Sequence, residues 1–268
     1  MAHNNTWGTN DISIPPEEGT VLLPHSQDQI DWMRLQRYLP ATLRQDLASV
    51  LPDTLVNRYA DPLNQLLYAV VTYVPRHMAL DLLQTPVVAR NSGEFLKGTL
   101  LFSDISGFTA LSERLRKKGD AEGAEAIVKV INDYLDVMLA IVFKYNGLLI
   151  KFGGDAMLCL FTGEDYGALR AVMAAWEMKQ TMLTRFSEIR ALDETVQLGM
   201  KVGSNSGLLL AANVGTAEHM EYILTGGAVE HTAHAESWAA RGDILISRDS
   251  YALVKDYLEV ERLSLIHI

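Results

Sequence analysis

Two acidic residues, Asp104 and Asp155, each border a short apolar run of the kind that forms buried strands. Asp104 ends GTLLFSD (98–104), and Asp155 follows the pair Gly153-Gly154 between two further apolar runs. Two carboxylates at one sheet edge would repel each other unless a cation lay between them. Mg²⁺ takes oxygen ligands, commonly one or two carboxylates together with substrate phosphates, and two such ions can align an attacking and a leaving oxygen. The pair therefore predicts a divalent-cation site.

A plainer interpretation exists for each acid on its own. Asp104 is placed where it could cap the following helix or close a turn, and Asp155 could be an ordinary acid of a hairpin. Each plainer interpretation is favoured if the acid is taken alone. The cation site is favoured only because both acids are expected at the same sheet edge.

The segment Ile105-Ser106-Gly107-Phe108-Thr109 joins the first of these strands to a helix. Gly107 lets the backbone approach a ligand closely, and the free amides at a helix N-terminus bind phosphate. Lys151 lies in an otherwise apolar strand, and two interpretations stay open for it: its amine reaches solvent, or it donates a hydrogen bond to a purine. Metal ligands beside a phosphate cradle favour nucleoside triphosphate chemistry.

The elements that would hold these residues alternate between strands and helices. After strand 98–104 the patterns predict helices 109–119 and 122–145, strands 147–152 and 156–161, helix 166–190, a hairpin over 197–215 turning near 205–207, strand 220–224, helix 229–240, and strands 243–247 and 257–261. This order predicts an α+β sandwich, with a mostly antiparallel sheet and helices on one face. A right-handed crossover makes strands 98–104 and 147–152 run the same way, which brings Asp104 and the 153–154 turn to one edge.

The rest of the chain divides into a flexible leader over 1–27, a helical segment and linker over 28–96, and a main domain over 97–263. The net charge of −10 disfavours nucleic acid and anionic membranes as partners. The longest apolar stretches, 66–74 and 138–143, are too short to span a bilayer, so no membrane span is expected. The single cysteine, Cys159, allows no disulfide within the chain, which fits a cytoplasmic protein.

Three ordered motifs resemble the signature regions of class III adenylyl and guanylyl cyclases. They are FSDISGFTALSE (102–113), IKFGGDAMLCLF (150–161) and VGSNSGLLLAANVGTAEHMEYILTGGAV (202–229). The resemblance covers about 97–262 and is closest to the first catalytic half of the soluble, bicarbonate-responsive type of adenylyl cyclase. It implies the ferredoxin-like nucleotidyl cyclase sandwich as the fold.

The resemblance also implies a reaction. Asp104, Asp155 and the carbonyl of Ile105 would hold two Mg²⁺ or Mn²⁺ ions, and the amides of Ser106 to Thr109 would bind the triphosphate of ATP. The ribose 3′-hydroxyl would attack the α-phosphorus, which releases pyrophosphate and cyclic AMP. The implied enzyme is an adenylate cyclase, a phosphorus-oxygen lyase of intracellular signal transduction.

The sequence departs from the family at the residues that a complete site needs. In these enzymes a second cyclase domain supplies base-reading residues and an Asn/Arg pair, but Glu230 and His234 stand at the Asn and Arg positions here and Ile223 at the base-reading position. Ala233 stands where bicarbonate-responsive relatives carry an arginine. The expected partner is therefore a second class III cyclase domain, in cis beyond residue 268 or in trans. The alternative is a catalytically weak regulatory module that binds nucleotide or anion.

A diguanylate-type cyclase is a third interpretation, based on the triplet Gly153-Gly154-Asp155. It is disfavoured because those enzymes need further acids directly after the triplet, whereas Ala156 and Met157 follow here.

Overall fold

The computed structural model describes residues 65–79, 91–116, 120–163, 166–192, 194–216 and 219–260. The chain divides into two compact units, Met1–Tyr73 and Val74–Ile268. The described part of the first unit contains a helix over 65–71, and a short helix over 76–79 begins the described part of the second. Both lie within the segment predicted to be helical, whereas the predicted leader lies outside the described residues.

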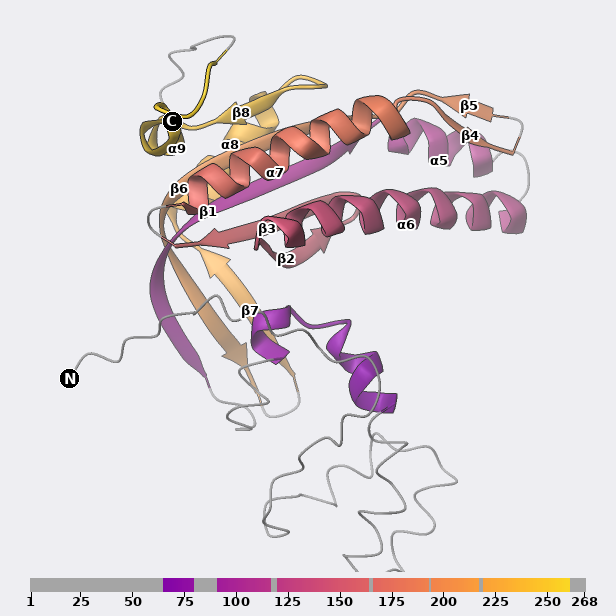
Figure 1. Ribbon diagram of the computed structural model, residues 1–268. Helices are drawn as coiled ribbons and strands as arrows, with labels where there is room; N and C mark the ends of the chain where they lie inside the picture. Colours follow the sequence, from indigo (N-terminus) through magenta and orange to yellow (C-terminus); the bar gives the residue numbers. More distant parts are fainter. Residues whose placement is uncertain are drawn as a thin grey trace, which may run out of the picture. The chain divides into compact units, whose positions relative to one another are not determined.

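One six-stranded sheet forms the centre of the second unit (Figure 1). Five strands follow the order β2-β3-β1-β6-β7, and a sixth, β8, pairs in parallel with β6, while every other pair in this sheet is antiparallel. Their bounds are β1 Ser92–Ser106, β2 Leu148–Gly153, β3 Ala156–Thr162, β6 Gly199–Gly215, β7 Met220–Thr225 and β8 Ile244–Ile246. Because β1 and β2 both run antiparallel to β3, they run the same way as each other, as predicted.

The helices follow the predicted order with one addition at the end. They are α5 Phe108–Arg116, α6 Asp120–Lys144, α7 Gly167–Thr181 continued by the π-helix η2 Met182–Phe186, α8 Gly227–Trp238 and α9 Arg248–Val254. A small hairpin, β4 Ile189–Ala191 and β5 Glu194–Val196, follows η2. In α6, the apolar side chains of Val130, Tyr134 and Met138 recur at four-residue spacing and are all buried, which explains why this long helix forms and which face packs inward.

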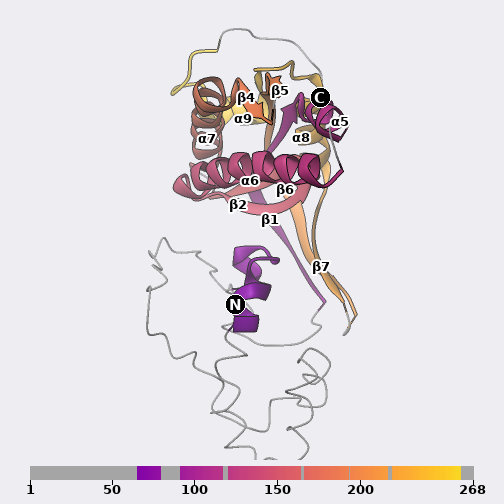
Figure 2. The ribbon, with the colours of Figure 1, turned by 90° about the vertical axis from the view of Figure 1, so that its right-hand side faces the viewer.

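Helices cover both faces of the sheet, so the prediction of helices on one face only is wrong. Leu101 and Ile105 of β1 belong to the core cluster that includes buried residues of α5, α6 and α7, whereas Leu100 belongs to a second cluster with Ala228 of α8. Figures 1 and 2 show α6 and α7 running along the same side of the sheet. Leu100 and Leu101 are both fully buried, as adjacent residues are when a strand is covered on its two faces.

Three further expectations were wrong, the first two because pairing in the sheet overrides local composition. The segment 91–97 is not a linker, since β1 begins at Ser92 and pairs with β6 from there. The segment 197–215 is not a hairpin, because Asn205 and Gly207 lie inside the ladder opposite Leu100 and Gly98. In the described part of 257–261 there is no strand. The helix α9 precedes it instead, with the Ser247 hydroxyl accepting a hydrogen bond from the Ser250 amide.

Candidate active site

The register of the sheet brings Asp104 and Asp155 to the same edge. The last pair between β1 and β3 is Ser103 with Met157, and the hairpin of β2 and β3 closes at Gly153 with Ala156. Asp104 is therefore one residue past the last pair on β1, and Asp155 lies in the turn directly before β3. Their charges interact, because the carboxylate of Asp155 contributes to raising the pKa of Asp104.

The electrostatic environment of Asp104 is unfavourable to its own charge. Its side chain is 30% exposed, and its pKa is raised from 3.8, first by burial and then by the charges of Asp155 and Glu236. The amine of Lys201 and a hydrogen bond from the backbone of Ile105 act in the opposite direction without cancelling the effect. A site that gathers carboxylates against their own repulsion is suited to a divalent cation, whose charge would remove the penalty.

Lys201 and Glu236 belong to this site and were missed by the sequence analysis. Lys201 lies directly opposite Asp104 in the ladder of β1 and β6, and its Nζ is 2.7 Å from Glu236 Oε1 but 3.9 Å from Asp104 Oδ2. Glu236 reaches it because α8 packs closely over Gly203, where an added Cβ would collide with the backbone nitrogen of Glu236. A lysine inside an otherwise apolar strand was the available signal for Lys201, whereas Glu236 had none.

The segment 105–109 has the form predicted for a phosphate-binding turn. β1 ends at Ser106, Gly107 has φ +97°, and α5 starts at Phe108. A Cβ at Gly107 would lie 2.9 Å from the Gln197 carbonyl oxygen, so the position requires glycine both for its conformation and for its space. The amide of Leu111 donates to the Gly107 carbonyl, and the amides that precede it are the first of the helix, which have no partner within it. No acidic side chain lies in the first turn of α5.

The other residues singled out by the sequence are exposed or lie further along the sheet. Lys151 is exposed on β2 and pairs with Leu158 of β3, whose partner on β1 is Phe102. The structure gives it no ion pair within the described ranges. Glu230, Ala233 and His234 are exposed on α8, and Ile223 is half-buried on β7. Glu230 and His234 are four residues apart and share one outward face of the helix.

Two buried hydroxyls lie behind the acids on the α6 side of the sheet. Tyr134 of α6 and Ser103 of β1 are almost completely buried, and neither hydroxyl has a hydrogen-bond partner among the described residues. Burial raises the pKa of Tyr134, and the charges of Asp104 and Asp155 raise it further. The phenol therefore stays neutral at physiological pH.

Comparison with known proteins identifies the family to which the chain is similar. The family described as the adenylate and guanylate cyclase catalytic domain matches residues 91–268. Adenylate cyclase type 10 of Rattus norvegicus is 27% identical over 176 residues, which is 65% of this chain and 11% of that protein. The Homo sapiens protein of the same name is 26% identical over 170 residues, 63% of this chain and 10% of that protein. The chain thus spans about a tenth of the length of these curated relatives.

Solved structures agree in fold and include both kinds of cyclase. The adenylyl cyclase CyaB from P. aeruginosa is 32% identical, with a TM-score of 0.53 over 62% of this chain and 84% of that chain. The guanylyl cyclase Cya2 is 30% identical, with a TM-score of 0.54 over 63% of this chain and 84% of that chain.

Among the described residues, no helix is long and apolar enough to cross a membrane.

Proposed function

The chain belongs to the family of adenylate and guanylate cyclase catalytic domains, and from this membership we propose that it is one half of an adenylate cyclase. It would convert ATP to cyclic AMP and pyrophosphate, with the metal-binding residues on this chain and the remaining site residues on a second cyclase domain. The observation that carries the proposal is the meeting of Asp104 and Asp155 at one sheet edge beside the turn at Gly107. ATP as substrate rests on the likeness to adenylate cyclase type 10.

The donor set fits hard divalent ions such as Mg²⁺ or Mn²⁺. In the described ranges no cluster of three or more His, Cys, Asp or Glu side chains could hold a metal. The proposed site has two carboxylates, and a bound metal would need further ligands. Mg²⁺ is commonly bound by one or two carboxylates and completed by substrate phosphates. Asp104 and Asp155 would be the ligands, together with the Ile105 carbonyl. Bound there, two such ions would supply charge neutralisation for the triphosphate and activation of the 3′-hydroxyl.

The chain's own residues would mainly orient the substrate. The amides from Ser106 to Thr109 would hold the phosphates, because they lie at the N-terminus of α5, where backbone amides are free to donate. No acidic side chain in the first turn of α5 would compete with the phosphates for these amides. Gly107 would allow the phosphates to approach the backbone, since a side chain there would displace the Gln197 carbonyl. Alignment and fixed dipoles of this kind provide most of the catalysis in phosphoryl transfer.

The need for a second domain is proposed from α8. Glu230 and His234 occupy an exposed face of this helix, at the positions where family members carry the Asn and Arg that stabilise the transition state. A carboxylate at the first position would repel a triphosphate. A symmetric pair of these chains would therefore be nearly inactive, whereas a partner that carries Asn and Arg would complete the site next to Asp104.

Measurement of cyclic AMP production with Mn²⁺ and ATP tests both parts of the proposal. The isolated chain should be nearly inactive, and a cyclase domain bearing Asn and Arg should restore turnover. In that mixture Asp104→Ala and Asp155→Ala should each abolish turnover, while Asp136→Ala, on the exposed side of α6, should leave it unchanged. Robust turnover by the isolated chain at low concentration would refute the half-site proposal. Competition between ATP and GTP in the same mixture shows which of the two nucleotides is the preferred substrate.

A regulatory module is the second candidate, and the exposed Glu230 favours it, because it replaces a residue that catalysis needs. In this case the domain would bind nucleotide or anion and control attached domains. The Asp104→Ala mixture separates the two candidates: undiminished cyclic AMP production with altered regulation would support the module.

A further inference from the structure

The outward face of α8 carries a row of side chains that could bind a metal ion. Glu230, His234 and Trp238 follow one another at four-residue spacing, and all three are exposed. The opposite face of the helix is fixed to the sheet, because α8 packs against the backbone of β6 at Gly203. The row therefore stands on a rigid support.

The imidazole of His234 is stacked on the indole of Trp238. Their ring centroids are 5.7 Å apart, and the two ring planes differ by 27°. A stacked imidazole uses its face for the contact and keeps its two nitrogens at the edge. Side chains on a helix lean toward its N-terminus, so Trp238 supports His234 from one side, and His234 leans toward Glu230 on the other.

The donor atoms of this pair are unused in the described part of the chain. There the Glu230 carboxylate and the His234 imidazole form no hydrogen bond and no ion pair. Residues four apart on a helix have Cβ atoms about 5–6 Å from each other, which allows one ion to bridge them. Imidazole nitrogen with carboxylate oxygen suits Zn²⁺ or Ni²⁺, whereas Mg²⁺ prefers oxygen ligands alone. The pair therefore suits a different ion from that proposed for Asp104 and Asp155.

We propose that Glu230 and His234 bind one divalent transition-metal ion, such as Zn²⁺ or Ni²⁺, with Trp238 positioning the imidazole. In the described ranges no third His, Cys, Asp or Glu side chain joins them. Water molecules would complete the coordination. An open site with two protein ligands binds its ion reversibly, so its occupancy would follow the supply of the metal.

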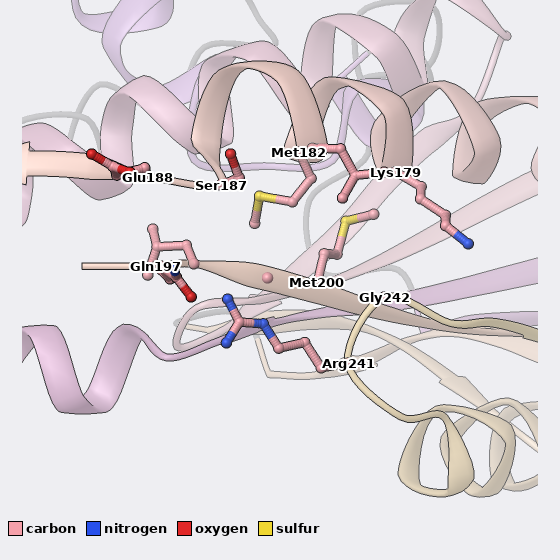
Figure 3. A pocket seen from close by; sticks show the side chains of 11 residues that line it. Lys179, Met182, Ser187, Glu188, Gln197, Met200, Arg241 and Gly242 are labelled. Carbon is pink, nitrogen blue, oxygen red and sulfur yellow. The ribbon is translucent and has the colours of Figure 1, made fainter. Parts of the chain in front are cut away.

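The groove at the start of β6, with a volume of about 370 Å³, offers no comparable donors (Figure 3). Among the described residues its lining contains no histidine and one acid, Glu188, which already has Arg190 at 4.0 Å. Met182 and Met200 are packed core residues, each 3% exposed. The unpaired donors that a transition metal needs are on α8 instead.

A bound ion would reverse the charge of this helix face, and this step rests on the proposed function. Glu230 alone would repel a triphosphate, whereas a doubly charged ion on Glu230 and a neutral His234 leaves one net positive charge. Family members carry the arginine of the transition state at the position of His234. The ion would therefore supply a positive charge that the side chains of this face lack.

Fluorine NMR of the full chain labelled with 5-fluorotryptophan tests the site directly. Ni²⁺ is paramagnetic, so an ion on His234 should broaden the signal of Trp238 at concentrations that leave the signal of Trp176 sharp. Trp238→Phe identifies the signal among those of the four tryptophans. Excess Mg²⁺ is present throughout, so that it occupies sites built from oxygen ligands.

Removal of either ligand should raise the Ni²⁺ concentration for half-maximal broadening about tenfold or more, because two linked ligands bind far more tightly than one. The variants are His234→Ala and Glu230→Gln, both at exposed positions. His219→Ala is the matched control, since this exposed histidine also has an acid beside it, Glu221 at 3.5 Å. It should behave like the wild type. Asp104→Asn should do so too, which separates this proposal from the proposed cyclase function.

Three results would each refute the proposal. The first is a Trp238 signal that broadens no sooner than that of Trp176. The second is undiminished broadening in His234→Ala or Glu230→Gln. The third is loss of the broadening in Asp104→Asn, which would place the ion at the carboxylate pair of the candidate active site.

Discussion

Replacing Asp104 by Asn should change stability in opposite directions with and without divalent metal. Asp104 carries a charge that burial, Asp155 and Glu236 all disfavour, so the metal-free fold is under electrostatic strain at this position. Asn keeps the size of the side chain and removes the charge. The metal-free variant should therefore be more stable than the wild type, whereas the wild type should be the more stable of the two in Mn²⁺.

The expected size of each change in stability follows from the partial exposure of the Asp104 side chain and from the free energy of metal binding. A partly exposed charge interaction contributes up to about 1 kcal/mol, and for a unit of this length that is about 2–4 °C in Tm. A metal held by Asp104 and Asp155 would add about 2.7 kcal/mol at a hundred times its Kd, which corresponds to about 5–10 °C in the wild type. Asp104→Asn should lose most of this gain.

The pH dependence of the metal-free protein has a definite sign. The pKa of Asp104 is raised in the folded state above its ordinary 3.8, so protonation favours the folded state. The penalty is complete above the raised pKa and is relieved as the pH falls through the interval down to 3.8. The advantage of Asp104→Asn in EDTA should therefore be present at neutral pH and disappear below this interval.

Thermal unfolding in EDTA and in Mn²⁺ measures these differences, with Asp136→Asn on the exposed side of α6 as the control. The control should follow the wild type in both solutions. An Asp104→Asn protein that is less stable than the wild type in EDTA, or that gains as much from Mn²⁺ as the wild type does, would refute the reasoning.

Three further substitutions test the surroundings of the site. Lys201→Ala should cost about 2–3 kcal/mol in urea unfolding, because it leaves the largely buried Glu236 without its cation, and it should raise the pKa of Asp104 further by NMR titration. Gly107→Ala should cost about 1–3 kcal/mol and lower the Tm, because of its φ of +97° and the nearby Gln197 carbonyl. Phe161→Ala should cost about 3–5 kcal/mol in urea unfolding, because its ring is fully buried.

Each of these three has an outcome that contradicts it. An unchanged urea midpoint for Lys201→Ala would mean that Glu236 finds another partner. Wild-type Tm for Gly107→Ala would mean that the turn relaxes without cost. A loss under 1 kcal/mol for Phe161→Ala would mean that the surrounding core closes over the space. Lys255→Ala, on an exposed lysine, is a suitable control for the first.

Sequence patterns predicted those parts of the fold in which one element determines its own structure. The spacing of Val130, Tyr134 and Met138 identified α6, and the apolar runs beside Asp104 and Asp155 identified β1 and β3. The right-handed crossover and the shared direction of β1 and β2 then sufficed to predict that the two acids lie at one sheet edge. The convergence was predictable because it depends on the ends of strands and not on side-chain contacts.

The remaining features depend on contacts between distant segments. Residues 92–97 have the composition of a linker and become strand only because β6 provides a partner for each of them. Glu236 joins the site only because Gly203 allows α8 to approach β6 closely. The helix α9 is a different case: Ser247 was an available helix-start signal, and its significance was missed.

The pairing of β1 with β6 also affects how the protein is made. Thr99 and Ser206, whose hydroxyls are 2.8 Å apart, are separated by 107 residues of chain. A ribosome adds about 5–20 residues per second. Several seconds therefore pass between the synthesis of β1 and the synthesis of its partner strand β6. During that time Leu100 and Leu101, which are completely buried in the finished sheet, lie on a strand with an open edge. Nascent chains should therefore depend on chaperones at this stage more than the finished domain does.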